Sequence, residues 1–482
     1  MTFSTLLDRR VRDTPGGKAI GDSRGSYDNQ HFLIRVRAVA GQLASLGIGR
    51  GDVVAVRLAN RVEFVFVLFA AWRIGACVTP VNPALTDREV ARQLSDSGAK
   101  LLIIEDGSEG QTGVDALAVA ELWTAAKSAD PEVVDDPSAI ALLIYTSGTT
   151  GAPKGVMLDH ANLDAMTEMG RVALQLGPDD RCLLILPLFH VNGIVVSVLS
   201  PLLVGASVSI ADRFNPAMFF DLVEAQGTTF FSAVPTIYNM LAALPDDVRP
   251  DTSSIRYGLC GAAPAPPELL EQFENRYGFP IIEAYGLSEA TCGSTINPLD
   301  GPRKTGTVGV AFPGQEIRIA DAGESAPVGV DGEVLVRGAN VMRGYLGRPE
   351  ETAATIVDGW LHTGDVGHLD TDGFLTLVGR VKDMIIRGGE NIYPKEVEDV
   401  LSSDPNVLQA AVIGVPDVKW GEVVVAYVQG RPGVSVEPAA LADLCAASLS
   451  PYKRPTKIHV VDALPTNAVG KIDKKALRTR GA

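Results

Sequence analysis

Short β-branched or leucine-rich runs alternate with helical patterns over most of this chain. Val53 to Leu58 is followed by the helical pattern Glu63 to Gly75, and Phe230 to Val234 is followed by Thr236 to Leu244. Alternation of this kind indicates an α/β fold with largely parallel sheets. A TIM barrel shares the alternation, but the spacing of the runs is too irregular to count eight units.

The pattern changes in the last third of the chain. From about Arg303, glycine and proline separate short alternating strands such as Glu316 to Ile319 and Gly332 to Arg337. After Lys382 comes a compact tail with its own pattern of strand, helix and strand. We therefore predict a β-rich subdomain, then a domain boundary near Lys382, and a small α+β domain after it.

Length and charge limit the classes of function. The 482 residues are enough for two or more domains. The formal net charge of −16 opposes general attraction to nucleic acid or to an anionic membrane, so we expect no nucleic acid as a partner. The apolar stretch Gly193 to Ile210 is interrupted by serines and by Pro201. We expect helix, turn and strand there, and no transmembrane segment.

The cysteines and the N-terminal sequence bear on the compartment. Five scattered cysteines without CxxC or metal-ligand spacing favour a reducing environment. The sequence MTFSTLLDRRVRDTPGG has no basic segment followed by an apolar one, so secretion is not indicated. We therefore expect a cytoplasmic location.

The run YTSGTTGAPKG at Tyr145 to Gly155 is rich in hydroxyls and glycines. Glycine allows close approach of the backbone, hydroxyls donate hydrogen bonds, and the lysine adds a positive charge. The run therefore predicts a loop that wraps a polyphosphate. It lacks the Walker spacing GxxxxGK followed by Ser or Thr. The predicted phosphate-binding residues are Thr146, Ser147, Gly148, Thr149, Thr150, Gly151 and Lys154.

Four further motifs follow the loop. They are YGLSE at Tyr285 to Glu289, HTGD at His362 to Asp365, GRVKDMIIRGGENIYPKEVE at Gly379 to Glu398, and PTNAVGK at Pro465 to Lys471. Together with the phosphate loop, they resemble the motifs of the AMP-forming acyl-CoA synthetases. These enzymes belong to the adenylate-forming superfamily, with luciferases and the adenylation domains of peptide synthetases. The resemblance runs from near Leu43 to Lys471, and five motifs in the family's order argue against coincidence.

The resemblance implies an ATP-dependent ligase that joins a carboxylic acid, a small-molecule substrate, to coenzyme A. The acid and ATP give an acyl-AMP and pyrophosphate, and a thiol then displaces AMP. Such a site needs positive charge where it stabilises the transition state. By resemblance, Lys471 contacts the carboxylate and the α-phosphate, Glu289 holds Mg²⁺, and Ser288 keeps the hydroxyl of the family's usual threonine. The other implied nucleotide contacts are Gly261, Ala262, Ala263, Tyr285, Gly286, Asp365 and Arg380.

The implied fold is α/β, with a large N-terminal domain of α/β subdomains plus a β-rich subdomain, and a small mobile C-terminal α+β domain. The AMP-binding domain would span residues 1–380 and the mobile domain residues 381–482, with the hinge near Lys382. In the second half-reaction the mobile domain would present a coenzyme A-binding segment to the site. That segment is Arg387, Gly388, Gly389 and Glu390, and an arginine at its first position is larger than the family's common residue.

The acid is the least constrained part of the prediction. The acyl pocket implied by the resemblance is lined by His190, Val234, Tyr238, Gly261 and Gly286. Gly286 would leave depth, and Tyr238 with His190 would border an aromatic or branched acid. Ala284 stands before Tyr285 where an arginine would favour a dicarboxylate such as malonate. We expect a medium-sized, aromatic or polycyclic carboxylic acid.

Three other interpretations remain open from the sequence. In the first, the protein transfers the acyl group to the phosphopantetheine of a carrier protein and not to free coenzyme A. In the second, it is a luciferase-like oxygenase, which only the shared motifs support. In the third, it binds an acyl-adenylate and performs only one half-reaction, since a fold alone does not establish a function.

Overall fold

The computed structural model describes residues 2–108, 113–122, 130–146, 153–263, 265–321, 323–466 and 472–481. The chain divides into two compact units. Unit 1 consists of Met1–Ile317, Leu335–His362 and Gly373–Leu375, and unit 2 consists of Arg318–Val334, Thr363–Asp372 and Thr376–Ala482. The chain therefore passes between the units several times. The predicted domain limits and the predicted hinge at Lys382 stay predictions.

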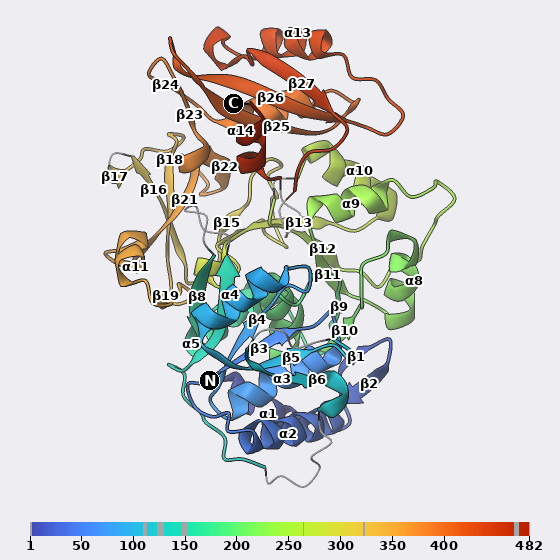
Figure 1. The fold of residues 1–482 in the computed structure, drawn as a ribbon. Coiled ribbons are helices and arrows are strands. Elements are labelled where there is room, and N and C mark those ends of the chain that lie inside the picture. The colour runs from blue at the N-terminus through green and yellow to red at the C-terminus, as the bar shows by residue number, and fades with distance from the viewer. Residues whose placement is uncertain are drawn as a thin grey trace. The chain divides into compact units, whose positions relative to one another are not determined.

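Unit 1 contains a nine-stranded sheet in the order β15-β14-β13-β12-β11-β9-β10-β1-β2 (Figure 1). Its centre, from β13 to β1, is parallel. Its edges are antiparallel, through β2 at one end and β14 and β15 at the other. The strands are β1 (Lys18–Asp22), β2 (Gly25–Asp28), β9 (Arg181–Leu184), β10 (Ser207–Ile210), β11 (Phe230–Ala233), β12 (Tyr257–Cys260), β13 (Ile281–Tyr285), β14 (Thr295–Ile296) and β15 (Val310–Ala311).

A second sheet of unit 1 has seven strands in the order β19-β8-β7-β4-β3-β5-β6. The strands from β7 to β6 are parallel, whereas β8 folds back on β7 and β19 pairs antiparallel with β8. Parallel sheets joined through helices confirm the predicted α/β class. The strands are β3 (Val53–Arg57), β4 (Cys77–Pro80), β5 (Ala99–Ile104), β6 (Asp115–Ala118), β7 (Ile140–Thr146), β8 (Lys154–Asp159) and β19 (Gly344–Tyr345).

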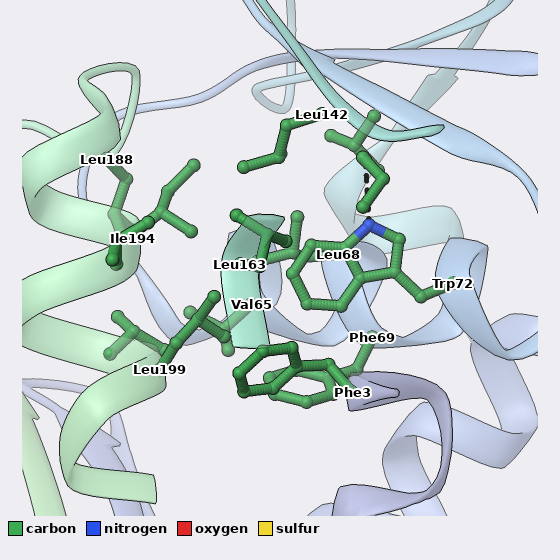
Figure 2. Packing of buried hydrophobic residues seen from close by; sticks show 14 of the residues in the cluster. Phe3, Val65, Leu68, Phe69, Trp72, Leu142, Leu163, Leu188, Ile194 and Leu199 are labelled. Atoms are coloured by element: carbon green, nitrogen blue, oxygen red, sulfur yellow. Dashed lines mark hydrogen bonds between the residues drawn. The ribbon is translucent and has the colours of Figure 1, made fainter. Parts of the chain in front are cut away.

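Helix α3 (Val62–Arg73) lies in the core of unit 1, and all of its residues are buried. Apart from Glu63 and Arg73 its residues are apolar, and a helix of this kind is stable only where other elements cover it on all sides. Its Trp72 donates a hydrogen bond from Nε1 to the Ala141 carbonyl of β7 at 2.8 Å, drawn as a dashed line in Figure 2. The same ring packs against Phe3, with centroids 6.0 Å apart. These contacts join α3 to the second sheet and to the N-terminal segment.

Three helices pack with β9 and β11 in a separate apolar cluster of unit 1, namely α8, α9 and α10, green in Figure 1. The stretch from 193 to 210 forms helix, turn and strand, as predicted. No helix in the described part of the chain is both long and apolar enough to cross a membrane. Besides α3, the helices of unit 1, these three included, are α1 (Leu6–Asp13), α2 (Asn29–Ser45), α4 (Asp87–Ser97), α5 (His160–Ala173), α6 (Val191–Ile194), α7 (Ser200–Leu203), α8 (Pro216–Gln226), α9 (Pro235–Ala242), α10 (Pro267–Tyr277) and α11 (Pro349–Thr355).

Unit 2 contains a five-stranded sheet in the order β24-β23-β26-β25, with β27 on β26. Buried residues of α12 and α13 pack with this sheet in one apolar cluster, and α14 adds Leu477 to another. This arrangement confirms the predicted small α+β domain. Its elements are β23 (Ile385–Arg387), β24 (Glu390–Ile392), α12 (Pro394–Ser402), β25 (Val407–Asp417), β26 (Gly421–Gly430), α13 (Pro438–Ser448), β27 (Lys457–Val461) and α14 (Lys474–Gly481).

A further sheet of short strands comes from residues 316–380, where the β-rich subdomain is predicted. In this group β16 pairs antiparallel with β17, and β20 pairs antiparallel with β21. Four of these strands, β16, β18, β21 and β22, each contain residues of both units. The strands are β16 (Glu316–Asp321), β17 (Glu324–Ser325), β18 (Gly332–Arg337), β20 (Ile356–Val357), β21 (Trp360–Leu369) and β22 (Leu375–Arg380).

Candidate active site

The predicted acyl and adenine residues of unit 1 follow neighbouring parallel strands. Strands β9, β11, β12 and β13 are adjacent and run in the same direction, so their carboxyl ends lie at one edge of the sheet. His190 comes after β9, Val234 after β11 and Gly261 after β12, while Tyr285 ends β13. In open α/β sheets, ligands bind outside the carboxyl ends of the strands. The fold therefore brings four segments that are distant in sequence to one candidate binding edge.

The segment after β12 has an unusual backbone. Ala262 has φ of 66°, in the left-handed region that side chains other than glycine rarely adopt. Ala262 and Ala263 are exposed, and Gly261 and Tyr285 are half-buried. A Cβ at Gly261 would lie 3.1 Å from the Ala284 carbonyl oxygen. Strained residues are concentrated at functional sites, and this one lies where the adenine contacts are predicted.

Gly286 does not deepen the acyl pocket in the way predicted. A Cβ at this position would lie 1.8 Å from the carbonyl oxygen of Cys292 and 2.7 Å from the Cα of Gly293. The space beside Gly286 is therefore filled by the chain's own backbone. Glycine is required here because two backbone segments approach closely. The prediction that its missing side chain makes room for the acid is wrong.

Tyr238 is a core residue and not a pocket wall. Its side chain is 0% exposed, and its hydroxyl donates to the Leu259 carbonyl at 2.8 Å. Its ring packs edge-on against Phe273, with centroids 5.0 Å apart. The prediction that Tyr238 borders the acid is therefore wrong. His190 and Val234 are half-buried, and the His190 ring lies with its centroid 4.5 Å from that of Phe189.

Two residues predicted to act on phosphate and metal meet at one tyrosine. The Tyr345 hydroxyl donates to Glu289 Oε1 at 2.9 Å. The Lys154 ammonium lies 4.9 Å from the centre of the Tyr345 ring and forms an ion pair with Glu351. Burial and the Glu289 carboxylate raise the pKa of Tyr345, so the phenol stays a donor at neutral pH. Sequence reasoning missed Tyr345, because none of the five motifs contains it.

The site fits a magnesium ion that arrives with phosphate. Among the described residues, no group of three or more His, Cys, Asp or Glu side chains could hold a metal. Mg²⁺ is usually bound through one or two carboxylates together with substrate phosphates. Glu289, which follows Ser288 in a 3-10 turn (Ser288–Ala290) after β13, offers one such carboxylate.

The phosphate loop connects two paired strands. Thr146 ends β7, Lys154 begins β8, and the two residues face each other in the antiparallel ladder. Thr466 and Ile472 likewise form an antiparallel bridge on either side of the predicted catalytic segment. The remaining predicted residues of both segments lie outside the described residues, namely Ser147, Gly148, Thr149, Thr150, Gly151 and Lys471.

The predicted ribose residues lie together in unit 2. Arg380 Nε donates to Asp365 Oδ1 at 2.5 Å, and Asp365 is 8% exposed. The Asp365 backbone N–H donates to the hydroxyl of Thr363 at 3.0 Å, and the intervening Gly364 has φ of 69°. The HTGD motif therefore lies within strand β21, with a local distortion at Gly364, and the bond from Arg380 fixes the direction of the Asp365 carboxylate. Convergence of Asp365 and Glu289 on one nucleotide stays a prediction.

The predicted coenzyme A segment is the tip of a β-hairpin in unit 2. Arg387 of β23 pairs with Glu390 of β24, and the two glycines between them have φ of 62° and 90°. Positive φ at both central residues is typical of a type I′ turn. Arg387 Nη1 donates to the Tyr452 carbonyl at 2.6 Å, so this arginine has a structural partner. Lys382, the predicted hinge, is exposed in a 3-10 turn (Val381–Asp383).

Comparison with known proteins gives the family. A family model described as AMP-binding enzyme matches residues 7–346, and the AMP-binding enzyme C-terminal domain matches residues 396–471. The chain is 39% identical over 481 residues to a feruloyl-CoA synthase of Amycolatopsis sp, covering 98% of this chain and 97% of that protein. It is 38% identical over 506 residues to an oxalate–CoA ligase of Arabidopsis thaliana, with coverages of 98% and 97%.

A solved structure with the same fold is o-succinylbenzoate CoA synthetase (MenE) from Bacillus subtilis. In its complex with the acyl-adenylate OSB-AMP it superposes with a TM-score of 0.91 at 34% identity, covering 98% of each chain. In its complex with ATP and magnesium the TM-score is 0.89 at 34% identity, with 97% of this chain and 98% of that one covered. These matches confirm the predicted fold class and the predicted acid–CoA ligase. The protein belongs to the AMP-binding enzyme family of adenylate-forming acid–CoA ligases.

Proposed function

We propose that this protein activates an aromatic carboxylic acid with ATP and Mg²⁺ and transfers the acyl group to coenzyme A. The acid's carboxylate attacks the α-phosphorus and pyrophosphate leaves. The thiol then attacks the acyl carbon, loses its proton, and AMP leaves. The observation that carries the proposal is that Tyr345 contacts both Glu289 and Lys154, the residue at the start of β8. That arrangement supports the proposal, because a metal–triphosphate needs both a cation and a carboxylate close by.

In unit 1, the roles follow from position and chemistry. Thr146 and Lys154 would hold the triphosphate with the loop residues 147–151, and Ser288 would add a hydroxyl donor. Glu289 would hold Mg²⁺, which would supply positive charge to the phosphate oxygens. Tyr285 would offer its ring to adenine, and the half-buried Gly261 with the exposed Ala262 and Ala263 would contact the base through small residues.

In unit 2, Asp365 would accept hydrogen bonds from the ribose hydroxyls, and Arg380 holds that carboxylate in place. We assign Lys471 to the carboxylate and α-phosphate oxygens in the first half-reaction. The hairpin tip formed by residues 387–390 would contact coenzyme A in the second. Residues 381–482 would turn about Lys382 between the two.

The choice of an aromatic acid rests on the candidate binding edge. Phe189 and His190 present two adjacent rings after β9, and Ala284 on β13 offers no cation to a second carboxylate. The similarity to a feruloyl-CoA synthase supports the same class. Oxalate and malonate are therefore the informative contrasts in a substrate screen.

Two assays test the proposal. With ATP and Mg²⁺, aromatic acids should promote both the exchange of labelled pyrophosphate into ATP and the consumption of coenzyme A, whereas oxalate and malonate should not. Lys471→Ala should abolish exchange, and Lys475→Ala, at an exposed lysine of α14, should not. Thioester formation from a supplied acyl-AMP without any exchange would contradict the two-step reaction. Transfer to a carrier phosphopantetheine but not to free coenzyme A would contradict the acceptor.

The hinge is tested separately. Proline fixes φ and removes a backbone donor, so Lys382→Pro should restrict the proposed rotation. We expect overall turnover to fall much more than ATP affinity. Unchanged turnover in this variant would argue against domain alternation.

A further inference from the structure

Tyr345 is held rigidly beside the phosphate loop. It lies on β19, which pairs with β8 so that Tyr345 faces Val156, two residues after Lys154. Its backbone N–H donates to the Thr352 hydroxyl at 2.9 Å, and the residue is 7% exposed. Gly344 has φ of 136°, and a Cβ there would lie 2.6 Å from the Thr352 side chain. Backbone pairing, the hydrogen bond and close packing therefore fix the position of the phenol ring.

The two groups that contact this ring carry opposite charge and have different proposed tasks. The hydroxyl donates to Glu289 Oε1, and the face of the ring lies under the Lys154 ammonium. An aromatic face attracts a cation, and the attraction grows when the cation is desolvated. The Lys154 side chain is only 12% exposed. One side chain thus limits the motion of both a carboxylate and an ammonium.

Glu351 is a further member of the group formed by Tyr345, Glu289 and Lys154. It forms an ion pair with Lys154, and its Oε1 lies 3.1 Å from Arg348 Nη1. The Arg348 guanidinium in turn reaches the Pro153 carbonyl at 3.4 Å, next to the phosphate loop. The Glu351 carboxylate therefore lies beside Lys154 as the counter-ion of its ammonium.

We propose that Tyr345 is a positioning residue for the metal–triphosphate, orienting Glu289 through its hydroxyl and Lys154 through its ring. In this arrangement the triphosphate replaces Glu351 as the partner of Lys154, while the ring keeps the ammonium in place. The inference rests on the proposed function, because it assigns Mg²⁺ to Glu289 and phosphate to Lys154. It adds that the metal-dependent and metal-independent parts of ATP affinity depend on different atoms of one side chain.

Calorimetric titration of the whole protein with ATP, with Mg²⁺ and with EDTA in its place, separates the two parts. Tyr345→Phe keeps the ring and removes the hydroxyl, so Mg²⁺·ATP affinity should fall about tenfold while metal-free ATP affinity stays within about twofold. Tyr345→Leu removes ring and hydroxyl, so both affinities should fall. Tyr277→Phe is the matched control, because it removes a buried phenol bond of 2.7 Å to the Leu241 carbonyl on α9. It should leave both affinities unchanged.

The outcomes distinguish this inference from the proposed function. If the unaltered protein does not bind ATP, the proposed function fails. If the unaltered protein binds Mg²⁺·ATP, and Tyr345→Phe binds Mg²⁺·ATP and metal-free ATP as tightly as the unaltered protein does, the positioning role is refuted. If Tyr345→Phe lowers the affinities for Mg²⁺·ATP and for metal-free ATP equally and also lowers the melting temperature, the tyrosine has a purely structural role. That result would also overturn the inference.

Discussion

Acidification should destabilise unit 1 through one buried histidine. His160 begins α5 and is 2% exposed, with its ring edge-on to Trp72 at a centroid distance of 5.4 Å. Its Nδ1 has no hydrogen-bond partner within the described residues. Burial lowers the pKa of His160 to about 4, against the opposing effect of the Asp135 and Asp136 carboxylates. The folded protein therefore keeps this imidazole neutral where an unfolded chain would protonate it.

The size of the effect follows from the two pKa values. Between the unfolded value near 6.5 and the folded value of about 4, the unfolded chain binds the additional proton. Stability from this group is therefore complete above the unfolded pKa and is lost as the pH falls towards the folded pKa. From about pH 7 to about pH 5 the loss is about 2 kcal/mol, and at still lower pH it reaches about 3 kcal/mol.

Urea unfolding at these two pH values measures the loss. His160→Phe keeps an aromatic ring against Trp72 but cannot take up a proton. The free energy of unfolding of the unaltered protein should therefore fall by about 2 kcal/mol more than that of the variant. His31→Gln, at an exposed histidine of α2, should behave as the unaltered protein does. If His160→Phe loses as much stability on acidification as the unaltered protein, the imidazole is not kept neutral by burial and the reasoning fails.

Three further predictions concern packing and the second half-reaction. Gly286→Ala should lower the free energy of unfolding by about 3 kcal/mol, because the new Cβ meets backbone; Gly170→Ala, whose Cβ would meet only a hydroxyl at 3.6 Å, should not lower it, as thermal unfolding will show. Arg10 donates five hydrogen bonds while 4% exposed. Arg10→Met should cost about 4 kcal/mol in urea unfolding, because the buried acceptors lose their donor. Gly388→Ala places a Cβ 3.0 Å from the Trp420 ring at a positive φ, and should slow thioester formation about tenfold with pyrophosphate exchange unchanged.

Local periodicity predicted the elements that hold the site. The runs at 53–58 and 230–234 are strands β3 (Val53–Arg57) and β11 (Phe230–Ala233), because β-branched and aromatic residues pack well on a pleated surface. The helix expected at 63–75 instead spans Val62–Arg73. Ends of elements depend on caps and on neighbouring strands, which a local pattern does not contain.

The directions of side chains were harder to predict from the sequence than the positions of helices and strands. Tyr238 follows a strand at the candidate binding edge, as a pocket residue would, but its position on α9 turns it towards Phe273 of α10. Gly286 is small, as a residue that makes room in a pocket would be, but its Cα faces the backbone of Cys292 and Gly293. Tyr345 is 56 residues from Glu289 and joins the site through the pairing of β19 with β8. Each outcome depends on contacts between elements, which composition and spacing do not record.

The turn that carries Glu289 shows why motifs alone leave the site incomplete. Thr291 and Cys292 have φ of 51° and 98°, in a region that disfavours their side chains. Such conformations persist only where the surroundings hold them. The side chain of Asn340, which is 0% exposed, donates to the Ala290 carbonyl at 2.7 Å, and its backbone carbonyl accepts from the Thr291 hydroxyl at 2.5 Å. Glu289, the residue proposed to hold Mg²⁺, lies in a motif, whereas Asn340, which holds the turn, lies about fifty positions later and in none of the motifs. A sequence motif therefore marks where chemistry occurs, and the tertiary contacts of residues such as Asn340 decide whether its geometry is kept.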